Sequence, residues 1–192
     1  MKFRIFITIL ALIITGSGLQ AQEKGNKNVV TQERVLEGFT GIVAGGTATI
    51  YIEQSDGFSV KVETDENLQD NVITRIEEQN LVIKTNKIKN PTKLKVHVSM
   101  PELLYLQASG ATDVKGKSAF ETEEMKIVVS GATSVELEIN VAYLETSVSG
   151  AADLNLSGSA DVHHMDASGA GSLDAVNMES RKVRYAVSGA SE

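Results

Sequence analysis

The triplet Ser-Gly-Ala occurs five times in the C-terminal half of this 192-residue chain, and this repetition limits the possible folds more than any other feature. Successive serines are separated by 21, 19, 19 and 20 residues. Repetition at a fixed period indicates stacked units of supersecondary structure. The copies are Ser109, Gly110, Ala111; Ser130, Gly131, Ala132; Ser149, Gly150, Ala151; Ser168, Gly169, Ala170; and Ser188, Gly189, Ala190.

Within a copy, apolar and polar residues alternate. In "SVELEI", Val135, Leu137 and Ile139 share one face of an extended chain, while Glu136 and Glu138 share the other. This period of two predicts strands, two or three short ones per copy. A single coil of about 20 residues cannot bury its own apolar face, whereas coils stacked at the ~4.8 Å strand spacing can. The sequence therefore predicts an all-β fold, a parallel β-solenoid (a right-handed β-helix).

The Ser-Gly-Ala triplets are predicted to form the turns between strands. Glycine adopts positive φ without a Cβ clash, so each glycine is assigned to a sharp corner. We expect the alanines to stack in a column too narrow for larger side chains. The serines, and the Asp or Ser two positions after each alanine, are expected to cap local backbone groups. All fifteen residues are thus interpreted as structural turn residues.

The N-terminal half has the same kind of pattern, less regularly. Strands are predicted at 47–52, 58–63, 81–84 and 93–100, and a single helical turn within 65–72. We assign 1–21 to a signal peptide, 22–34 to a flexible leader and 35–192 to one domain. Within that domain, 35–100 holds irregular strands and 101–192 the tandem copies.

The first residues are typical of an export signal. Lys2 and Arg4 precede an apolar run from Ile5 to Ile14, and small or polar residues follow up to Ala21. The run is about half the length of a membrane span. We expect cleavage after Ala21, no membrane span in the mature chain, and a secreted, periplasmic or outer-surface location.

The charge and composition exclude some partners. Removal of residues 1–21 removes two basic residues and changes the formal net charge from −7 to −9. An acidic protein is repelled by nucleic acids, so no nucleic-acid partner is predicted. The chain has no Cys, and therefore no disulfide. Aromatic residues make up 5%, few for a sugar-binding platform.

The segment "FTGIVAGGTATIYIEQSDGFSVKVETDENL", followed by "NLVIKT" and the tandem "SGAT" and "SGAADL" copies, resembles the head GIN domain family of putative autotransporter adhesins. The resemblance covers about residues 35–192. It implies secretion by Bacteroidetes-type bacteria and a β-helical, adhesin-like protein. It implies no catalytic residues.

Two patterns could indicate metal sites. His163 and His164 lie near Asp161 and Asp166, but adjacent strand residues point to opposite faces, which favours exposed strand residues instead. The turn aspartates resemble those of calcium β-rolls. However, Asp113 and Asp153 would lie two strand spacings apart, about 10 Å, which is too far to share a cation. We predict no metal and no cofactor.

Two further segments could be functional. A β-helical polysaccharide lyase needs long loops around a cleft, and the longest candidate, 116–124, is more simply a solvated edge. Residues 84–95 hold five lysines, which could bind a polyanion such as a surface glycan or lipopolysaccharide, or form a solubilising loop and edge. Asn155 begins a formal glycosylation sequon within a predicted strand, and no role is assigned to it.

We therefore predict a non-enzymatic, adhesin-like module of the cell envelope that presents a flat face to an unidentified protein or glycan. The alternative is a protein that binds or degrades polysaccharide. The last coil, about 177–192, ends in an apolar strand without a polar cap. We expect that coil either to fray or to self-associate with another chain through its edge.

Overall fold

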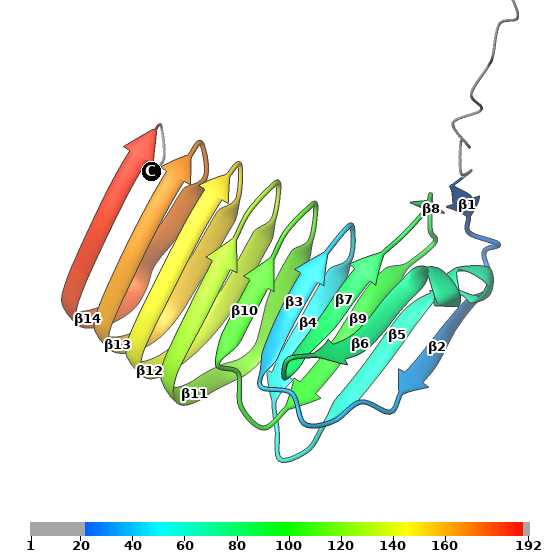
Figure 1. Cartoon of the computed structure of the whole chain (residues 1–192), viewed down its shortest axis with the longest axis horizontal. Coiled ribbons are helices and arrows are strands. Elements are labelled where there is room, and N and C mark those ends of the chain that lie inside the picture. The colour runs from blue at the N-terminus through cyan, green and yellow to red at the C-terminus, as the bar shows by residue number, and fades with distance from the viewer. Residues whose placement is uncertain (1–21, 190–192) are drawn as a thin grey trace, which may run out of the picture.

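The computed structural model of the chain describes residues 22–189, and these are almost entirely β-structure (Figure 1). The signal-peptide prediction for 1–21 and the last turn residue, Ala190, lie outside the described residues. The elements of the N-terminal half are β1 (Glu23–Lys24), β2 (Val29–Arg34), β3 (Gly41–Gly45), β4 (Thr49–Gln54), β5 (Ser59–Asp65), the 3₁₀ helix η1 (Glu66–Asn71), β6 (Val72–Glu77), β7 (Asn80–Thr85), β8 (Ile88–Lys89) and β9 (Leu94–Met100). They are followed by β10 (Tyr105–Ala108), β11 (Asp113–Val129), β12 (Ser134–Gly150), β13 (Asp153–Gly169) and β14 (Ser172–Gly189).

Within residues 22–189, twelve strands form one mixed sheet, and β1 and β8 form a separate pair. The order is β2-β5-β9-β4-β11-β10-β3-β7-β6, with β12, β13 and β14 following β11. Strand β11 contributes to two parts of the sheet, because residues 113–116 pair with β4 and residues 126–129 pair with β10. Each long strand therefore runs along one face, bends, and continues along the other.

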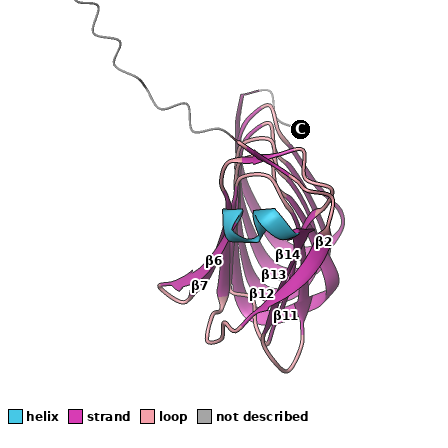
Figure 2. Ribbon diagram, turned by 90° about the vertical axis from the view of Figure 1, so that its right-hand side faces the viewer, coloured by secondary structure: helices cyan, strands magenta, loops and turns pink. Residues whose placement is uncertain are grey.

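We name the two faces after their strands. The β4 face contains β2, β5, β9, β4 and the first halves of β11 to β14. The β3 face contains β6, β7, β3, β10 and the second halves of the long strands. The bends join the two faces along one side and the Ser-Gly-Ala turns along the other. The end-on view of Figure 2 shows that the sheet is nearly closed around the core.

The prediction of a parallel β-solenoid built of short-strand rungs is wrong, although the fold is all-β. Strand β5 pairs antiparallel with both β2 and β9, and β6 pairs antiparallel with β7, so the sheet is mixed. Strands β11, β12 and β13 each run for 17 residues and β14 for 18. Alternation records which side chains point inward, but not where a strand bends or which direction its neighbour runs.

The predicted flexible leader, 22–34, also differs from the structure. Strand β2 lies at the edge of the β4 face and pairs with β5 over its whole length. The Asp65 carboxylate accepts hydrogen bonds from the backbone N–H of Lys27 (2.6 Å) and of Thr92 (2.6 Å), which joins this segment to the loop before β9. A polar composition suggested a free leader, but these long-range contacts order it.

The N-terminal strands were predicted with better success. The expected segments 47–52, 58–63, 81–84 and 93–100 correspond to β4, β5, β7 and β9, and the expected helical turn corresponds to η1. Leu68 of η1 is fully buried and helps to cover the N-terminal end of the core.

The core lies between the β4 and β3 faces and follows the predicted alternation. Val135, Leu137 and Ile139 are buried, whereas Glu136 and Glu138 are exposed, which confirms the orientation assigned to this strand. Burial of side chains of this size stabilises a fold by roughly 1.5–3 kcal/mol each. The largest fully buried side chains are Phe39, Phe120, Ile42, Ile50, Ile52, Leu68, Leu81, Ile83, Met100, Leu103, Leu106 and Met125.

Candidate functional site: a lysine-rich surface on the β4 face

The Ser-Gly-Ala turns stack on one another in register. Gly110, Gly131, Gly150 and Gly169 have φ of 83°, 84°, 80° and 102°. A Cβ on Gly131 would lie 2.7 Å from the carbonyl oxygen of Gly110 in the neighbouring turn. These positions therefore need glycine both for the backbone conformation and for the close approach of the next turn.

The other turn residues behave differently from the prediction. Ala111, Ala132, Ala151 and Ala170 are exposed, so it is the glycines and not the alanines that form the tight column. Ser109 donates its hydroxyl to the Ala44 carbonyl at 3.2 Å.

Two buried threonines that were not predicted from the sequence cap these turns. Thr112 and Thr133 donate their hydroxyls to the carbonyls of Ser109 (2.8 Å) and Ser130 (2.7 Å). Their position directly after the alanine in "SGAT" was the available signal.

The two adjacent histidines point to opposite sides. His163 is buried, so the prediction that it is an exposed strand residue is wrong. Its ring is 1% exposed and lies 2.9 Å from the buried Thr146 hydroxyl. Burial lowers the pKa of His163 to about 4, and His164 acts in the same direction. His164 faces outward, where its Nδ1 lies 2.9 Å from the Tyr143 hydroxyl. In the described part of the chain, no three His, Asp or Glu side chains are grouped as metal ligands.

The turn aspartates are separated as the spacing argument required. Ser134 pairs with Asp113 on one side and with Asp153 on the other, so one whole strand lies between the two carboxylates. Asp113 forms an ion pair with Lys115 at 3.3 Å.

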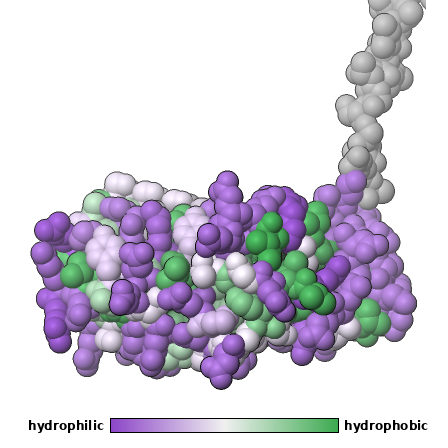
Figure 3. Space-filling view, turned by 60° about the horizontal axis from the view of Figure 1, so that its bottom comes forward, coloured by the Kyte–Doolittle hydropathy of each residue, from purple (hydrophilic) through white to green (hydrophobic). Residues whose placement is uncertain are grey.

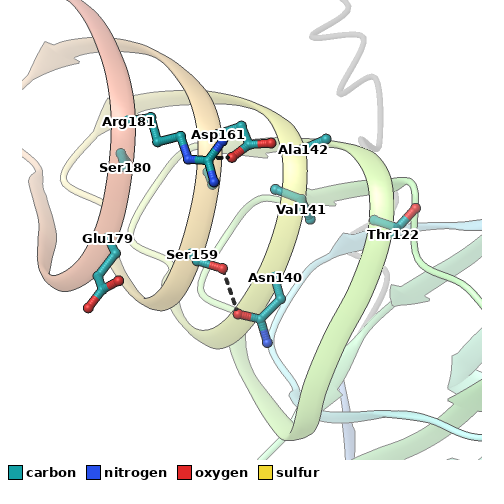
Figure 4. Close-up of a pocket in the computed structure, with 10 residues that line it drawn as sticks. Thr122, Asn140, Val141, Ala142, Ser159, Asp161, Glu179, Ser180 and Arg181 are labelled. Carbon is teal, nitrogen blue, oxygen red and sulfur yellow. Dashed lines mark hydrogen bonds and ion pairs between the residues drawn. The ribbon is translucent and has the colours of Figure 1, made fainter.

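A hollow of about 530 Å³ lies where the long strands bend (Figure 4). Arg181 pairs with Asp161 at 3.2 Å, and the Ser159 hydroxyl donates to the Asn140 side-chain oxygen at 2.9 Å. Glu179 extends away from both pairs. Arg181 and Asp161 are 85% and 54% exposed, so the hollow is an open polar surface and not an enclosed cleft.

The lysines of 84–95 do not form one cluster. Lys87 lies in a turn at φ 57°, Lys84 lies on the β3 face, and Lys93 forms an ion pair with Glu63 at 3.0 Å. Only Lys95 belongs to the group of cations described next, so the lysine-rich segment indicated basic character but not the site.

We define the basic surface as Lys61, Lys95, His97, Tyr51, Lys115 and Lys117 on the outside of the β4 face. Four of them form a row across adjacent strands. Lys61 of β5 pairs with His97 of β9, His97 pairs with Tyr51 of β4, and Tyr51 pairs with Lys115 of β11. The four residues come from segments far apart in the sequence.

An irregularity in β11 adds Lys117 to this row. The pairing of β11 with β12 shifts between Lys115 and Ala119, because β11 has two more residues than β12 at this point. The Ser118 hydroxyl accepts a hydrogen bond from the backbone N–H of Gln54 at 2.8 Å, which fixes the bulge against β4. A bulge of this kind redirects a side chain. Here it places the Lys117 ammonium 4.5 Å from the centre of the Tyr51 ring.

The two aromatic rings organise the cations. Tyr51 and His97 are stacked, with ring centres 5.0 Å apart and an interplanar angle of 19°. The ammonium groups of Lys117 and Lys95 lie 4.5 and 5.5 Å from the Tyr51 ring centre, within the range of cation–π attraction.

The neighbouring charged groups have opposite effects on the pKa of His97. Burial lowers its pKa, and the nearby ammonium groups of Lys95, Lys117 and Lys61 lower it further. The Glu63 carboxylate acts in the opposite direction. Three ammonium groups and one carboxylate therefore lie close enough to His97 to affect its pKa.

The remaining outer surface is mixed. On the side shown in Figure 3, apolar residues lie in small groups between hydrophilic ones. On the β4 face, the row of Tyr51 and Lys115 continues into Glu136, Asn155 and Asp174, so the lysines of the basic surface lie on β5, β9 and β11 and not on the strands that follow β11.

Five members of the basic surface were not predicted from the sequence as site residues: Tyr51, His97, Lys61, Lys115 and Lys117. Alternation in "TIYIEQ" and "KLKVHVSM" places Tyr51, Lys95 and His97 on the outer side of their strands, which was a usable signal. The pairing of β9 with β4 could not be obtained from that alternation.

A family model described as "Putative auto-transporter adhesin, head GIN domain" matches residues 38–192. No match to this chain was found among curated proteins.

Several solved structures have a similar fold. A putative adhesin from Bacteroides fragilis is 21% identical, with a TM-score of 0.82 over 86% of this chain and 78% of that one. A putative adhesin from Parabacteroides distasonis is 25% identical, with a TM-score of 0.80 over 85% of this chain and 71% of that one. A protein from the same species, described as a putative lipid binding protein, is 24% identical, with a TM-score of 0.67 over 86% and 80%.

Proposed function

This chain belongs to the family of putative auto-transporter adhesins with a head GIN domain, and from that membership we propose that it is a non-enzymatic, adhesin-like binding module of the cell surface or the secreted space. The resemblance found in the sequence is thereby confirmed at the level of the family. Two solved relatives are themselves described as putative adhesins.

The observation that carries this proposal is the β4 face. Its outward side chains lie in register across adjacent strands, so a partner meets a broad surface on a rigid sheet. A rigid surface loses little conformational entropy on binding, which favours recognition without rearrangement. Binding residues held on strands are also positioned more closely than residues on mobile loops.

A catalytic role has less support. The hollow at the bends contains Asp161 and Glu179, the carboxylates that a glycoside hydrolase would need in its site. Asp161 is paired with Arg181, and both side chains are largely exposed to solvent. Neither carboxylate lies in an enclosed cleft that could hold a substrate away from water.

The proposed location rests on the family and on the export signal expected in residues 1–21. Among residues 22–189, no helix has the length and hydrophobicity required to cross a membrane.

The proposal is tested with the fluorescently labelled chain 22–192, applied to intact bacterial cells, to animal epithelial cells and to an array of neutral and acidic glycans. We expect saturable binding to at least one of these surfaces, and no release of new reducing ends from the array glycans. Absence of saturable binding to all three would overturn the adhesin proposal, and release of reducing ends would favour the enzymatic alternative.

A further inference from the structure

The basic surface has the extent of a short stretch of a ligand chain. Lys61, His97, Tyr51 and Lys115 occupy four adjacent strands, so the row spans about 14 Å at a strand spacing of ~4.8 Å. The ammonium groups of Lys95 and Lys117 both lie close to the Tyr51 ring. A row of cations at the strand spacing suits a linear ligand with repeated negative groups.

Most of these cations are available to a ligand. Among the described residues, Lys61, Lys95 and Lys117 form no ion pair, whereas Lys115 is paired with Asp113. The contacts of Lys95 and Lys117 with the Tyr51 ring leave the ammonium N–H groups able to donate to an anion. The neighbouring carboxylate of Glu63 is already paired with Lys93.

Hydroxyl groups border the cations. Thr49 lies two residues before Tyr51 on the outer side of β4, and Ser59 of β5 pairs with Ser99 of β9 two residues away from the pair of Lys61 and His97. The Tyr51 hydroxyl lies on the row itself. Hydroxyls donate and accept hydrogen bonds, so this surface can meet both the anionic groups and the neutral hydroxyls of a sugar chain.

From these contacts we infer that the basic surface binds an acidic glycan, with Lys61, Lys95 and Lys117 contacting its carboxylate or sulfate groups and the Tyr51, Ser59 and Ser99 hydroxyls contacting the sugar ring hydroxyls. This inference rests on the proposed function and specifies the ligand class of that binding module. A nucleic-acid duplex is less suitable, because it extends well beyond the row and the formal net charge of −9 of the chain without residues 1–21 repels that part of it, whereas a short acidic oligosaccharide is contained within the row.

The test uses the chain 22–192 and three probes: polygalacturonate oligosaccharides with carboxylates only, heparin oligosaccharides with sulfates as well, and neutral dextran. Binding is measured by titration calorimetry in 50 and 300 mM NaCl. The variant Lys95→Gln/Lys117→Gln removes two cations of the basic surface. The matched control Lys84→Gln/Lys182→Gln removes the same charge from β7 and β14, outside that surface.

We expect an acidic probe to bind and dextran not to bind. The Lys95→Gln/Lys117→Gln variant should bind about tenfold more weakly, and the control variant should equal the unaltered protein. The higher salt concentration should weaken binding, because it shortens the screening length to less than the extent of the row. Thermal unfolding of both variants by circular dichroism verifies that their folds are intact.

A nuclear magnetic resonance titration of the His97 ring gives a second readout. Bound carboxylate or sulfate offsets the Lys61, Lys95 and Lys117 charges, so the pKa of His97 should rise when an acidic probe is present. The pKa of the buried His163, which faces the core, should not change.

Equal binding by the two variants, or an unchanged pKa of His97, would overturn the acidic-glycan inference. If the labelled protein nevertheless binds cells saturably, the adhesin proposal remains and only its ligand class is wrong. Concentration-dependent light scattering without any probe, abolished in the Lys95→Gln/Lys117→Gln variant, would instead assign the basic surface to contact with the acidic half of a second copy.

Discussion

The buried histidine of β13 should make the protein less stable as the pH falls from about 6.5 to 4. His163 is 1% exposed, and its ring lies 2.9 Å from the Thr146 hydroxyl inside the core. Burial lowers its pKa from 6.5 to about 4 in the folded protein. The unfolded chain therefore binds more protons in this window, and the free energy of unfolding must decrease as the pH is lowered.

The size of this effect follows from the shift. A difference of about 2.5 pKa units corresponds to about 3 kcal/mol, since each unit is worth about 1.4 kcal/mol. The contribution is complete above pH 6.5, where His163 is neutral in both states. It is lost progressively down to pH 4, where protonation of the folded state begins to limit the loss.

The perturbation is the double variant Thr146→Val/His163→Leu, which replaces both hydrogen-bonding groups and leaves neither one buried without a partner. Urea unfolding is measured at pH 7.5, 6.5, 5.5 and 4.5. The unaltered protein should lose most of the 3 kcal/mol between pH 6.5 and 4.5, and the double variant should lose much less over the same range.

A control separates the contribution of the exposed histidine on the basic surface. The pKa of His97 is also lowered, but its side chain is exposed and not part of the core. The variant His97→Gln should therefore retain most of the pH dependence of the unaltered protein. If the double variant and the unaltered protein have parallel pH profiles, His163 is not the titrating group and the reasoning is refuted.

Three further predictions concern the fold, each tested by urea unfolding. Gly131→Ala should destabilise the protein by more than ~1 kcal/mol, because Gly131 has φ 84° and the added Cβ would meet the Gly110 carbonyl oxygen. Ala132→Ser, at an exposed position, should be nearly neutral, and equal losses of stability would contradict the glycine column. Val135→Asp should cost several kcal/mol and Glu136→Lys almost nothing, since only the first side chain is buried, and similar losses would refute the assignment of faces. Asp65→Ala should destabilise the protein by about 2 kcal/mol or more, because it removes the acceptor for the hydrogen bonds of Lys27 and Thr92. Amide exchange in β1 and β2 should become faster, and unchanged exchange there would show that these bonds do not hold the N-terminal segment.

Sequence periodicity predicted the local structure of this chain better than its pairing. The alternation around Val135 and Glu136 specified the inward and outward side chains correctly, because burial depends on residue chemistry with period two. The recurring Gly110, Gly131 and Gly150 marked the turns. The sequence periodicity does not indicate that β5 pairs antiparallel with β9, nor where the 17-residue strands bend. The predicted solenoid of short strands was therefore wrong.

The candidate site was the least predictable part. Lys61, His97, Tyr51 and Lys115 meet only through the pairing of strands that are distant in the sequence, and Lys117 joins them through a bulge. The lysine-rich segment 84–95 was conspicuous in the sequence, yet its lysines disperse over both faces. The prediction that the C-terminal edge self-associates remains a prediction, to be tested by light scattering.

The central claim, that the protein binds its surface partner through the basic surface of the β4 face, is tested most directly by lysine acetylation footprinting. The chain 22–192 is treated with an acetylating reagent free in solution and while bound to the cell or glycan surface that captures it, and modification is quantified by mass spectrometry. The account predicts that binding protects Lys61, Lys95 and Lys117, while Lys84 and Lys182 are modified equally in both states. Protection of Lys84 or Lys182 without protection of Lys95 and Lys117 would contradict it.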